Sequence, residues 1–228
     1  FLAEGPKLVG DLLGHFPCRF LAATPSWFQE HPGIDASELV EVSQEDLSRA
    51  SLLKTPQQVL AIFEQPQYTL DPEAVRSSLC LALDDVQDPG NLGTIIRAGE
   101  GAGITGVVMS SDTADIYNPK VIRSTMGSVL RVPFVYASDL KEACEQMKKA
   151  GISLYAAHLK GMHNYDQEDY TKDTGFLIGN EAKGLTDEMA AVADTYIKIP
   201  MAGQVESLNA AVASSVLMFE AARQRRNS

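Results

Sequence analysis

Three polar stretches of this chain hold residue types that could bind a ligand and act on it. They cover residues 84–97, 179–185 and 199–209, and each follows or closes an apolar run that is typical of a strand. Together they contain an arginine, acidic and basic side chains, several asparagines and several glycines. The loops at helix N-termini are natural ligand sites, because their backbone N–H groups lack helical partners.

The third stretch is predicted to be the end of a strand, a loop and the start of a long helix. Pro200 ends the strand pattern of residues 195–199, because proline cannot donate to a central sheet ladder. Ser207 or Asn209 is expected to cap the helix that follows. An ordinary strand-loop-helix unit would produce the same local pattern, so this stretch alone decides nothing.

The first two stretches have the same ambiguity when each is considered singly. In the first, Asn91 is expected to cap a helix that carries Arg97, and Gly93 to permit close approach. In the second, glycines flank an acid, Glu181. Ligands of open parallel sheets bind at the carboxyl ends of the strands, so three such stretches at strand ends favour a site.

The order of apolar and polar segments indicates two units. Residues 1–65 read as a small α/β module, and prolines mark residues 65–73 as the connection. From residue 78 strands alternate with helices, which predicts a mostly parallel sheet covered on both faces. The expected strands are 78–84, 106–110, 130–135, 152–157, 176–179 and 195–199. The expected helices are 92–102, 119–126, 140–150, 188–193 and 209–225, and residues 158–173 are expected to form a loop.

The chain is acidic, with a net charge of −11 over 228 residues. Residues 1–75 carry 4 Lys and Arg against 11 Asp and Glu, a net charge of −7, and residues 76–228 carry the remaining −4. Broad, non-specific nucleic-acid binding needs a basic surface, so this balance argues against it and leaves room only for a local basic site.

Several other functions have little support in the composition. No apolar run reaches the roughly 18 residues of a membrane span. The three cysteines are widely spaced, which favours a reducing, cytoplasmic setting over disulfides or zinc. His158 and His163 lack ligand spacing, so we read both as loop residues and expect no metal. The chain begins at Phe1 without a signal-peptide pattern, and we expect further residues upstream.

The three stretches together resemble the motifs of the SpoU (TrmH-like) branch of the SPOUT RNA methyltransferases. Asn91-x-Gly93-x-x-x-Arg97 resembles the first motif, and Gly179-Asn180-Glu181-x-x-Gly184 resembles the second. Ile199-Pro200-Met201 with Ser207-Leu208-Asn209 resembles the third. A single motif would be weak, but the set keeps the family's order and spacing across residues 78–225.

The resemblance implies a fold and a domain organisation. Residues 78–228 would be the catalytic domain, an α/β fold with a mostly parallel sheet and a C-terminal trefoil knot. Residues 1–70 resemble an L30e-like substrate-binding domain that lacks its upstream segment, and residues 71–77 would be the linker. The family works as a homodimer and transfers a methyl group from S-adenosylmethionine to a ribose 2′-hydroxyl of RNA.

The resemblance also assigns roles to individual residues. Gly179, Ile199 and Leu208 would hold the cofactor through backbone groups, with Met201 and Ala202 beside it.

The remaining motif residues match the family's polar catalytic set. They are Asn91, Arg97, Glu181, Ser207 and Asn209. RNA contacts would come from Arg97 together with Lys120 and Arg123, although the last two could equally be part of a solvated helix face.

The chemistry of 2′-O-methylation accounts for these residue types. The hydroxyl must be polarised or deprotonated, whereas the sulfonium already activates the methyl group, so positioning could supply much of the rate without a metal. An arginine is a poor base because its pKa exceeds about 12, so Arg97 is expected to anchor a phosphate. Glu181 is expected to pair with Arg97, while Asn91 and Asn209 orient Arg97 and the ribose.

Alternative functions remain open from the sequence. The RNA could be a tRNA, although chain length and the first module favour rRNA by family analogy. The protein could also be a catalytically silent RNA-binding paralogue, but such a protein need not keep the polar set together. A small-molecule or protein methyltransferase would suit the acidic charge.

Overall fold

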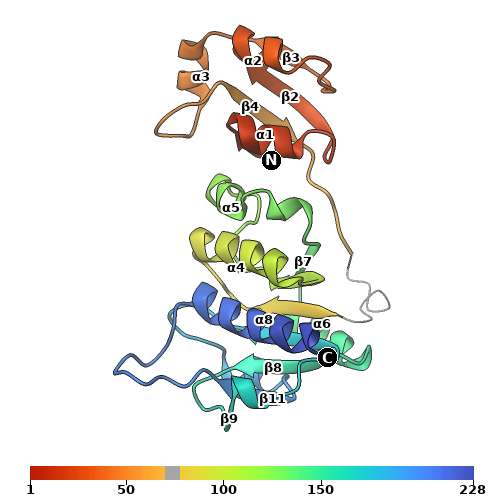
Figure 1. The fold of residues 1–228 in the computed structure, drawn as a ribbon, viewed down its shortest axis with the longest axis vertical. Coiled ribbons are helices and arrows are strands. Elements are labelled where there is room, and N and C mark those ends of the chain that lie inside the picture. Colours follow the sequence, from red (N-terminus) through yellow and green to blue (C-terminus); the bar gives the residue numbers. More distant parts are fainter. Residues whose placement is uncertain (70–77) are drawn as a thin grey trace.

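The computed structural model describes residues 1–69 and 78–228, which form two units, each built on its own sheet (Figure 1). The linker expected at 71–77 lies outside the described residues, as does residue 70, the predicted end of the first domain. The predicted domain boundaries therefore stay predictions.

The N-terminal unit is a four-stranded sheet in the order β1-β4-β2-β3, in which only β2 and β3 are parallel. Its elements are β1 (Leu2–Glu4), α1 (Pro6–Leu12), β2 (Cys18–Ala23), α2 (Pro25–Glu30), β3 (Leu39–Glu41), α3 (Gln44–Ala50) and β4 (Val59–Phe63). The prediction of a small α/β module over residues 1–65 included neither β1 nor α2. The start of α2 was nevertheless readable, because Thr24 caps it and Pro25 occupies its first turn. Trp27, on α2, is buried in the core of this unit.

The larger unit is a seven-stranded sheet in the order β7-β6-β5-β10-β8-β11-β9, and every pair in it is parallel. This confirms the predicted mostly parallel α/β fold, while the trefoil knot stays a prediction. Its strands are β5 (Leu79–Leu83), β6 (Gly106–Ser110), β7 (Phe134–Ala137), β8 (Ser153–Ala157), β9 (His163–Asn164), β10 (Thr174–Ile178) and β11 (Thr195–Lys198). Its helices are α4 (Pro89–Ala102), α5 (Pro119–Thr125), α6 (Leu140–Lys149), α7 (Asp187–Ala190) and α8 (Ala210–Arg226), with two 3₁₀ turns, η2 (Ser128–Leu130) and η3 (Tyr165–Gln167).

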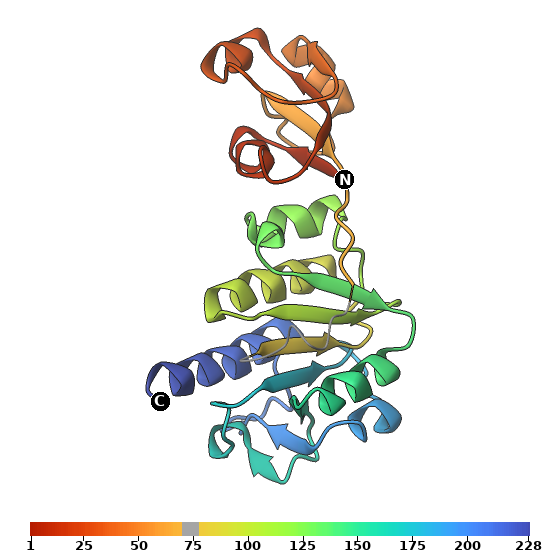
Figure 2. The same cartoon turned by 90° about the vertical axis from the view of Figure 1, so that its right-hand side faces the viewer.

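Burial on both faces explains the unbroken apolar run of the central strand β5. Leu79, Leu81 and Leu83 pack into the core beneath α4, α5 and α8, whereas Cys80 and Ala82 face the core beneath α6 and α7. Figure 2 shows α8 and α6 on opposite sides of the sheet. A strand covered on both faces needs apolar residues at every position rather than at alternate ones.

One helix cap and one strand differ in detail from the prediction. Asp88, and not Asn91, caps α4, because its carboxylate accepts from the backbone N–H of Asn91 at 2.8 Å. Asn209 caps α8 as expected, whereas Ser207 does not. The strand expected at 130–135 begins only at Phe134, since Leu130 belongs to η2. In the described parts of the chain, no helix has the length and apolar character needed to cross a membrane.

Candidate functional site

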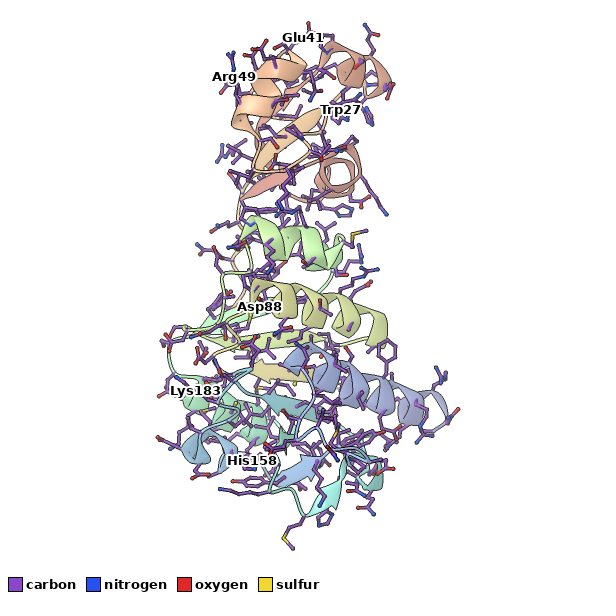
Figure 3. The ribbon with its side chains drawn as sticks, turned by 90° about the vertical axis from the view of Figure 1, so that its left-hand side faces the viewer. Trp27, Glu41, Arg49, Asp88, His158 and Lys183 are labelled. Atoms are coloured by element: carbon purple, nitrogen blue, oxygen red, sulfur yellow. The ribbon has the colours of Figure 1, made fainter. Side chains whose placement is uncertain are left out.

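A cavity of about 640 Å³ opens at the carboxyl edge of the larger sheet. Four loop segments line it together with the first turns of α8. They are residues 157–160 after β8, 178–185 at the end of β10, 197–201 at the end of β11, and 206–208 before α8. Figure 3 shows Asp88, Lys183 and His158 one below another along this edge. The volume and the mainly apolar lining are typical of a small-molecule site.

Glycine makes the turn after β10 possible. A Cβ on Gly179 would overlap the backbone of Gly184 and Leu185, so no other residue fits there without displacing the turn. Gly184 has a φ of 68°, a left-handed conformation that glycine adopts without strain. Asn180 closes the turn by accepting from the N–H groups of Ala182 and Lys183. The second polar stretch is thus a rigid wall of the cavity.

Glu181, Asn91 and Asn209 form a hydrogen-bonded network beside this wall. The Glu181 carboxylate accepts from the Asn91 side-chain amide at 2.9 Å and from the backbone N–H groups of Asp88 and Gln87 at 3.0 and 3.1 Å. The Asn91 carbonyl oxygen accepts from the Asn209 amide at 2.9 Å. Three elements that are far apart in the sequence therefore meet at this network.

The network holds Glu181 as an anion. Partial burial alone would raise the pKa of Glu181, but the hydrogen bonds from Asn91 and from backbone N–H groups outweigh it, so the pKa lies below its ordinary value. The expected ion pair of Glu181 with Arg97 is wrong for this structure. Asn91 reaches the carboxylate instead, since it lies in the first turn of α4.

Arg97 lies farther along α4 and is exposed to solvent. Within residues 1–69 and 78–228 it has no ion-pair partner, so its guanidinium is available to a ligand anion. Asn91 and Asn209 bond each other rather than Arg97, so the structure does not bring Arg97 into the network.

The two other residues predicted to contact RNA lie on α5. The Lys120 amine is 3.5 Å from the Asp88 carboxylate, and this ion pair is exposed, so it contributes little to stability. Arg123 is half-buried and makes no ion pair with any residue that the structure describes. The helix α5 packs against α4, which carries Arg97, because Gly93 of α4 lies directly against Ser124 of α5. Gly93 therefore permits the close approach of α5 to α4.

The residues expected to hold the cofactor separate into two groups. Gly179, Ile199, Met201 and Leu208 line the cavity, as do Glu181 and Ser207. Ala202 is exposed and does not line the cavity.

The sequence reading missed one wall of the cavity entirely. Residues 157–160 line it because β8 lies between β10 and β11 in the sheet, and His158 follows that strand directly. The rule that placed the other stretches at strand ends would also have selected His158. Asp85 is a second omission, since its left-handed backbone (φ 56°) places its carbonyl to accept from Asn180 at 2.8 Å.

No group of three His, Cys, Asp or Glu side chains is arranged to hold a metal ion among the described residues. That the chemistry needs no metal stays a prediction.

Comparison with known families accounts for both units. Residues 78–219 match the model of the SpoU rRNA methylase family. This chain belongs to that family. Residues 1–61 match the model of the MRM3-like substrate binding domain, in line with the predicted substrate-binding module.

Two curated relatives illustrate how far the similarity to SpoU family proteins extends. The chain is 33% identical over 178 residues to a Bacillus subtilis protein named 23S rRNA (guanosine(2553)-2′-O)-methyltransferase RlmP, a match that covers 78% of this chain and 70% of that protein. It is 30% identical to the human rRNA methyltransferase 3, mitochondrial, over 99% of this chain and 68% of that protein.

One of the similar solved structures contains a bound cofactor. The SpoU methyltransferase AviRb from Streptomyces viridochromogenes, in complex with AdoMet, superposes with a TM-score of 0.88 at 30% identity. The superposition covers all of this chain and 91% of that one. The fold of both units is therefore that of SpoU methyltransferases.

Proposed function

We propose that this protein transfers the methyl group of S-adenosylmethionine to a ribose 2′-hydroxyl of ribosomal RNA. The observation that carries the proposal is the cavity at the strand ends, bordered by the Glu181–Asn91–Asn209 network in a chain of the SpoU family. Relatives that match both units are named for rRNA, which favours rRNA over tRNA.

S-adenosylmethionine fits the cavity in size and in the character of the lining. Apolar side chains such as Ile199, Leu208 and Leu217 line it together with a few polar groups, and Gly179 lines it with no side chain of its own. We infer that Gly179, Ile199 and Leu208 hold the cofactor. When bound, the cofactor would supply an electrophilic methyl group on a sulfonium and leave as the neutral thioether, so the protein need not activate the methyl donor. The proton of the 2′-hydroxyl would pass to water.

The polar residues would then position the RNA. Arg97, exposed and without an ion pair in the described chain, anchors a phosphate next to the target ribose. Glu181 already accepts three hydrogen bonds, so it fixes Asn91 rather than removing the hydroxyl proton. Ser207 lines the cavity and can hydrogen-bond the ribose, while Lys120 and Arg123 extend the phosphate contacts along α5.

A methyl-transfer assay tests the proposal. Purified protein, labelled S-adenosylmethionine and bacterial rRNA should give one or a few 2′-O-methylated nucleotides, mapped by sequencing. Arg97→Ala should lower methylation by at least about 100-fold with cofactor affinity unchanged by calorimetry. Arg226→Ala, which removes an exposed arginine of α8, is the control. Near wild-type methylation by Arg97→Ala, or no methylation of any RNA by the wild type, would contradict the proposal.

A homodimer and a reducing, cytoplasmic setting belong to the same proposal. Val212 and Phe219 of α8 are 49% and 51% exposed, an apolar face that a second copy could cover. Light scattering on the purified protein tests the dimer. The three cysteines are free and buried, and burial raises the pKa of Cys80 and Cys144 to about 12, so these thiols are unreactive and suit a reducing compartment.

A further inference from the structure

Aromatic rings bridge the N-terminal unit and the catalytic unit. Phe1 stacks on Tyr117, with ring centroids 5.0 Å apart and planes inclined by 26°. The same Phe1 ring lies 5.5 Å from Phe16 and 5.7 Å from Phe63, both of the N-terminal unit. Tyr117 immediately precedes the cap of α5, so the rings join the core of one unit to the other.

The bridge continues into the catalytic unit and includes the segment after β4. Tyr117 packs edge-on against Phe134 of β7 at 5.7 Å, and Tyr68 packs against the same ring at 5.2 Å. The Tyr117 hydroxyl donates to the carbonyl of Pro66 at 3.1 Å. Tyr117 therefore contacts the N-terminal unit, the connecting segment and the catalytic core at once.

A second set of apolar contacts lies beside the rings. Leu8 of α1 packs against the core of the catalytic unit, and Leu130 of η2 packs against the core of the N-terminal unit. Within the described ranges no ion pair joins the two units. Apolar burial is therefore the main contact between the units, beside the attraction of the Phe1 amino group to Asp115, so salt should weaken the contact only slightly.

The contact continues to the proposed active site through packed helices. α5 lies against α4, where Gly93 contacts Ser124, and α4 lies against α8. Figure 1 shows α1, α5, α4 and α8 stacked one above another. Asn91 of α4 holds Glu181 in the cavity wall. The N-terminal unit thus rests on the same helix stack that positions the network.

We propose that Tyr117 is a positioning residue that fixes the N-terminal unit at a set separation from the cavity and thereby selects which ribose is methylated. The inference rests on the proposed function, because it assumes an RNA substrate that touches both units. RNA held by the N-terminal unit then presents one nucleotide to the cavity, at a distance set by the aromatic bridge. With the bridge broken, neighbouring nucleotides become accessible and the correct one is presented less often.

The first test maps methylation by Tyr117→Ala. The variant should lose about 10- to 100-fold in kcat/KM at the wild-type nucleotide and gain methylation at nearby riboses, while cofactor affinity stays unchanged. Tyr117→Phe keeps the ring and should retain the wild-type site. Tyr165→Ala is the matched control, because Tyr165 is a half-buried tyrosine of the same core at the opposite edge of the sheet.

A merely structural role for Tyr117 would lower activity without moving the methylated site. The proposal is therefore overturned if Tyr117→Ala methylates only the wild-type nucleotide, whatever its rate. If Tyr117→Ala loses cofactor affinity through misfolding, Leu8→Gln tests the contact from the N-terminal side with the same expected redistribution. A failure of the proposed function is distinguishable, since then the wild type itself would methylate no RNA.

The second test measures the separation directly and needs no RNA. Spin labels on Leu52→Cys and Met162→Cys, which are 64% and 88% exposed, report the distance between the units. The native cysteines are buried and should not react. The wild-type background should give one narrow distance distribution at low and high salt, and Tyr117→Ala a broad one. A broad distribution in the wild-type background would overturn the proposal.

Discussion

At the scale of single residues, the hydrogen bonds of Glu181 decide which role this side chain can have in the candidate site. Its two oxygens accept from one side-chain amide and two backbone N–H groups, which leaves little capacity for a proton from substrate. An ionised carboxylate that accepts several N–H groups stabilises the turn it bonds. Glu181 is thus better suited to hold the cavity wall than to act as a base.

Glu181→Gln should destabilise the protein in a pH-dependent way. The folded state lowers the pKa of Glu181 below 4.5, so the ionised group stabilises the fold above that pH, and the contribution is lost as the pH falls through the folded-state value. Because Glu181 is exposed, solvent screens part of this contribution, so urea unfolding should show a free energy of unfolding lower by about 1 kcal/mol for Glu181→Gln at pH 7, a difference that narrows as the pH falls below 4.5.

The control for this measurement is Glu206→Gln. Glu206 also lines the cavity but is exposed and makes no hydrogen bond to the rest of the described chain. Its replacement should change the free energy of unfolding by less than about 0.5 kcal/mol. If the loss in free energy of unfolding caused by Glu181→Gln stays constant from pH 7 to pH 3, the ionised carboxylate is not what stabilises the fold.

At the scale of elements, the helix stack is held by close backbone approach. Gly93 of α4 meets both the carbonyl of Val121 and the side chain of Ser124 on α5. Gly99 of the same helix lies close to Met218 of α8. Small residues on α4 thus let two helices pack against it, which brings Asn209 within reach of Asn91.

Gly93→Ala should separate α5 from α4. The added Cβ would overlap the Ser124 side chain, and overpacking of this kind costs about 1–3 kcal/mol. Gly101→Ala on the same helix is the control, because the nearest atom to its Cβ would be Phe219 Cζ at 3.7 Å. That variant should be neutral or more stable by up to about 1 kcal/mol, since alanine favours helix. Thermal unfolding followed by circular dichroism compares the two, and equal destabilisation would argue against this packing.

At the scale of the whole molecule, the last helix closes the catalytic unit. The Arg225 guanidinium donates to the carbonyls of Ser78, Tyr170 and Lys172, at 2.7, 2.8 and 2.5 Å. These carbonyls belong to the segment before β5 and to the segment before β10, so a single side chain joins the end of the unit to its beginning.

Arg225→Met should destabilise the catalytic unit. The substitution removes three hydrogen bonds to partly buried carbonyls, but the carbonyls of Ser78 and Lys172 still accept from Thr174, so the loss should cost about 1–2 kcal/mol in urea unfolding. Arg226→Met at the same helix end is the control, because Arg226 is exposed, and it should change stability by less than about 0.5 kcal/mol. Equal stability of the two variants would mean that the three hydrogen bonds contribute nothing net.

The sequence by itself determined the architecture of the larger unit and indicated where the candidate site lies. Alternating apolar strands and amphipathic helices predicted a parallel sheet, and polar stretches at strand ends predicted its ligand edge. Both predictions rest on local patterns, because residues close together in the sequence show the period at which side chains are buried along a strand or helix. The motif set identified the family for the same reason.

The tertiary structure alone decided which of these residues touch. Asn91 and Glu181 are 90 positions apart, and Asn91 and Asn209 are 118 apart, so no local pattern distinguishes Asn91 from Arg97 as the partner of Glu181. The place of β8 between β10 and β11 made His158 part of the cavity, and the docking of Phe1 on Tyr117 joined the two units. Such contacts depend on strand order and on how closely helices approach, which packing of the whole chain sets.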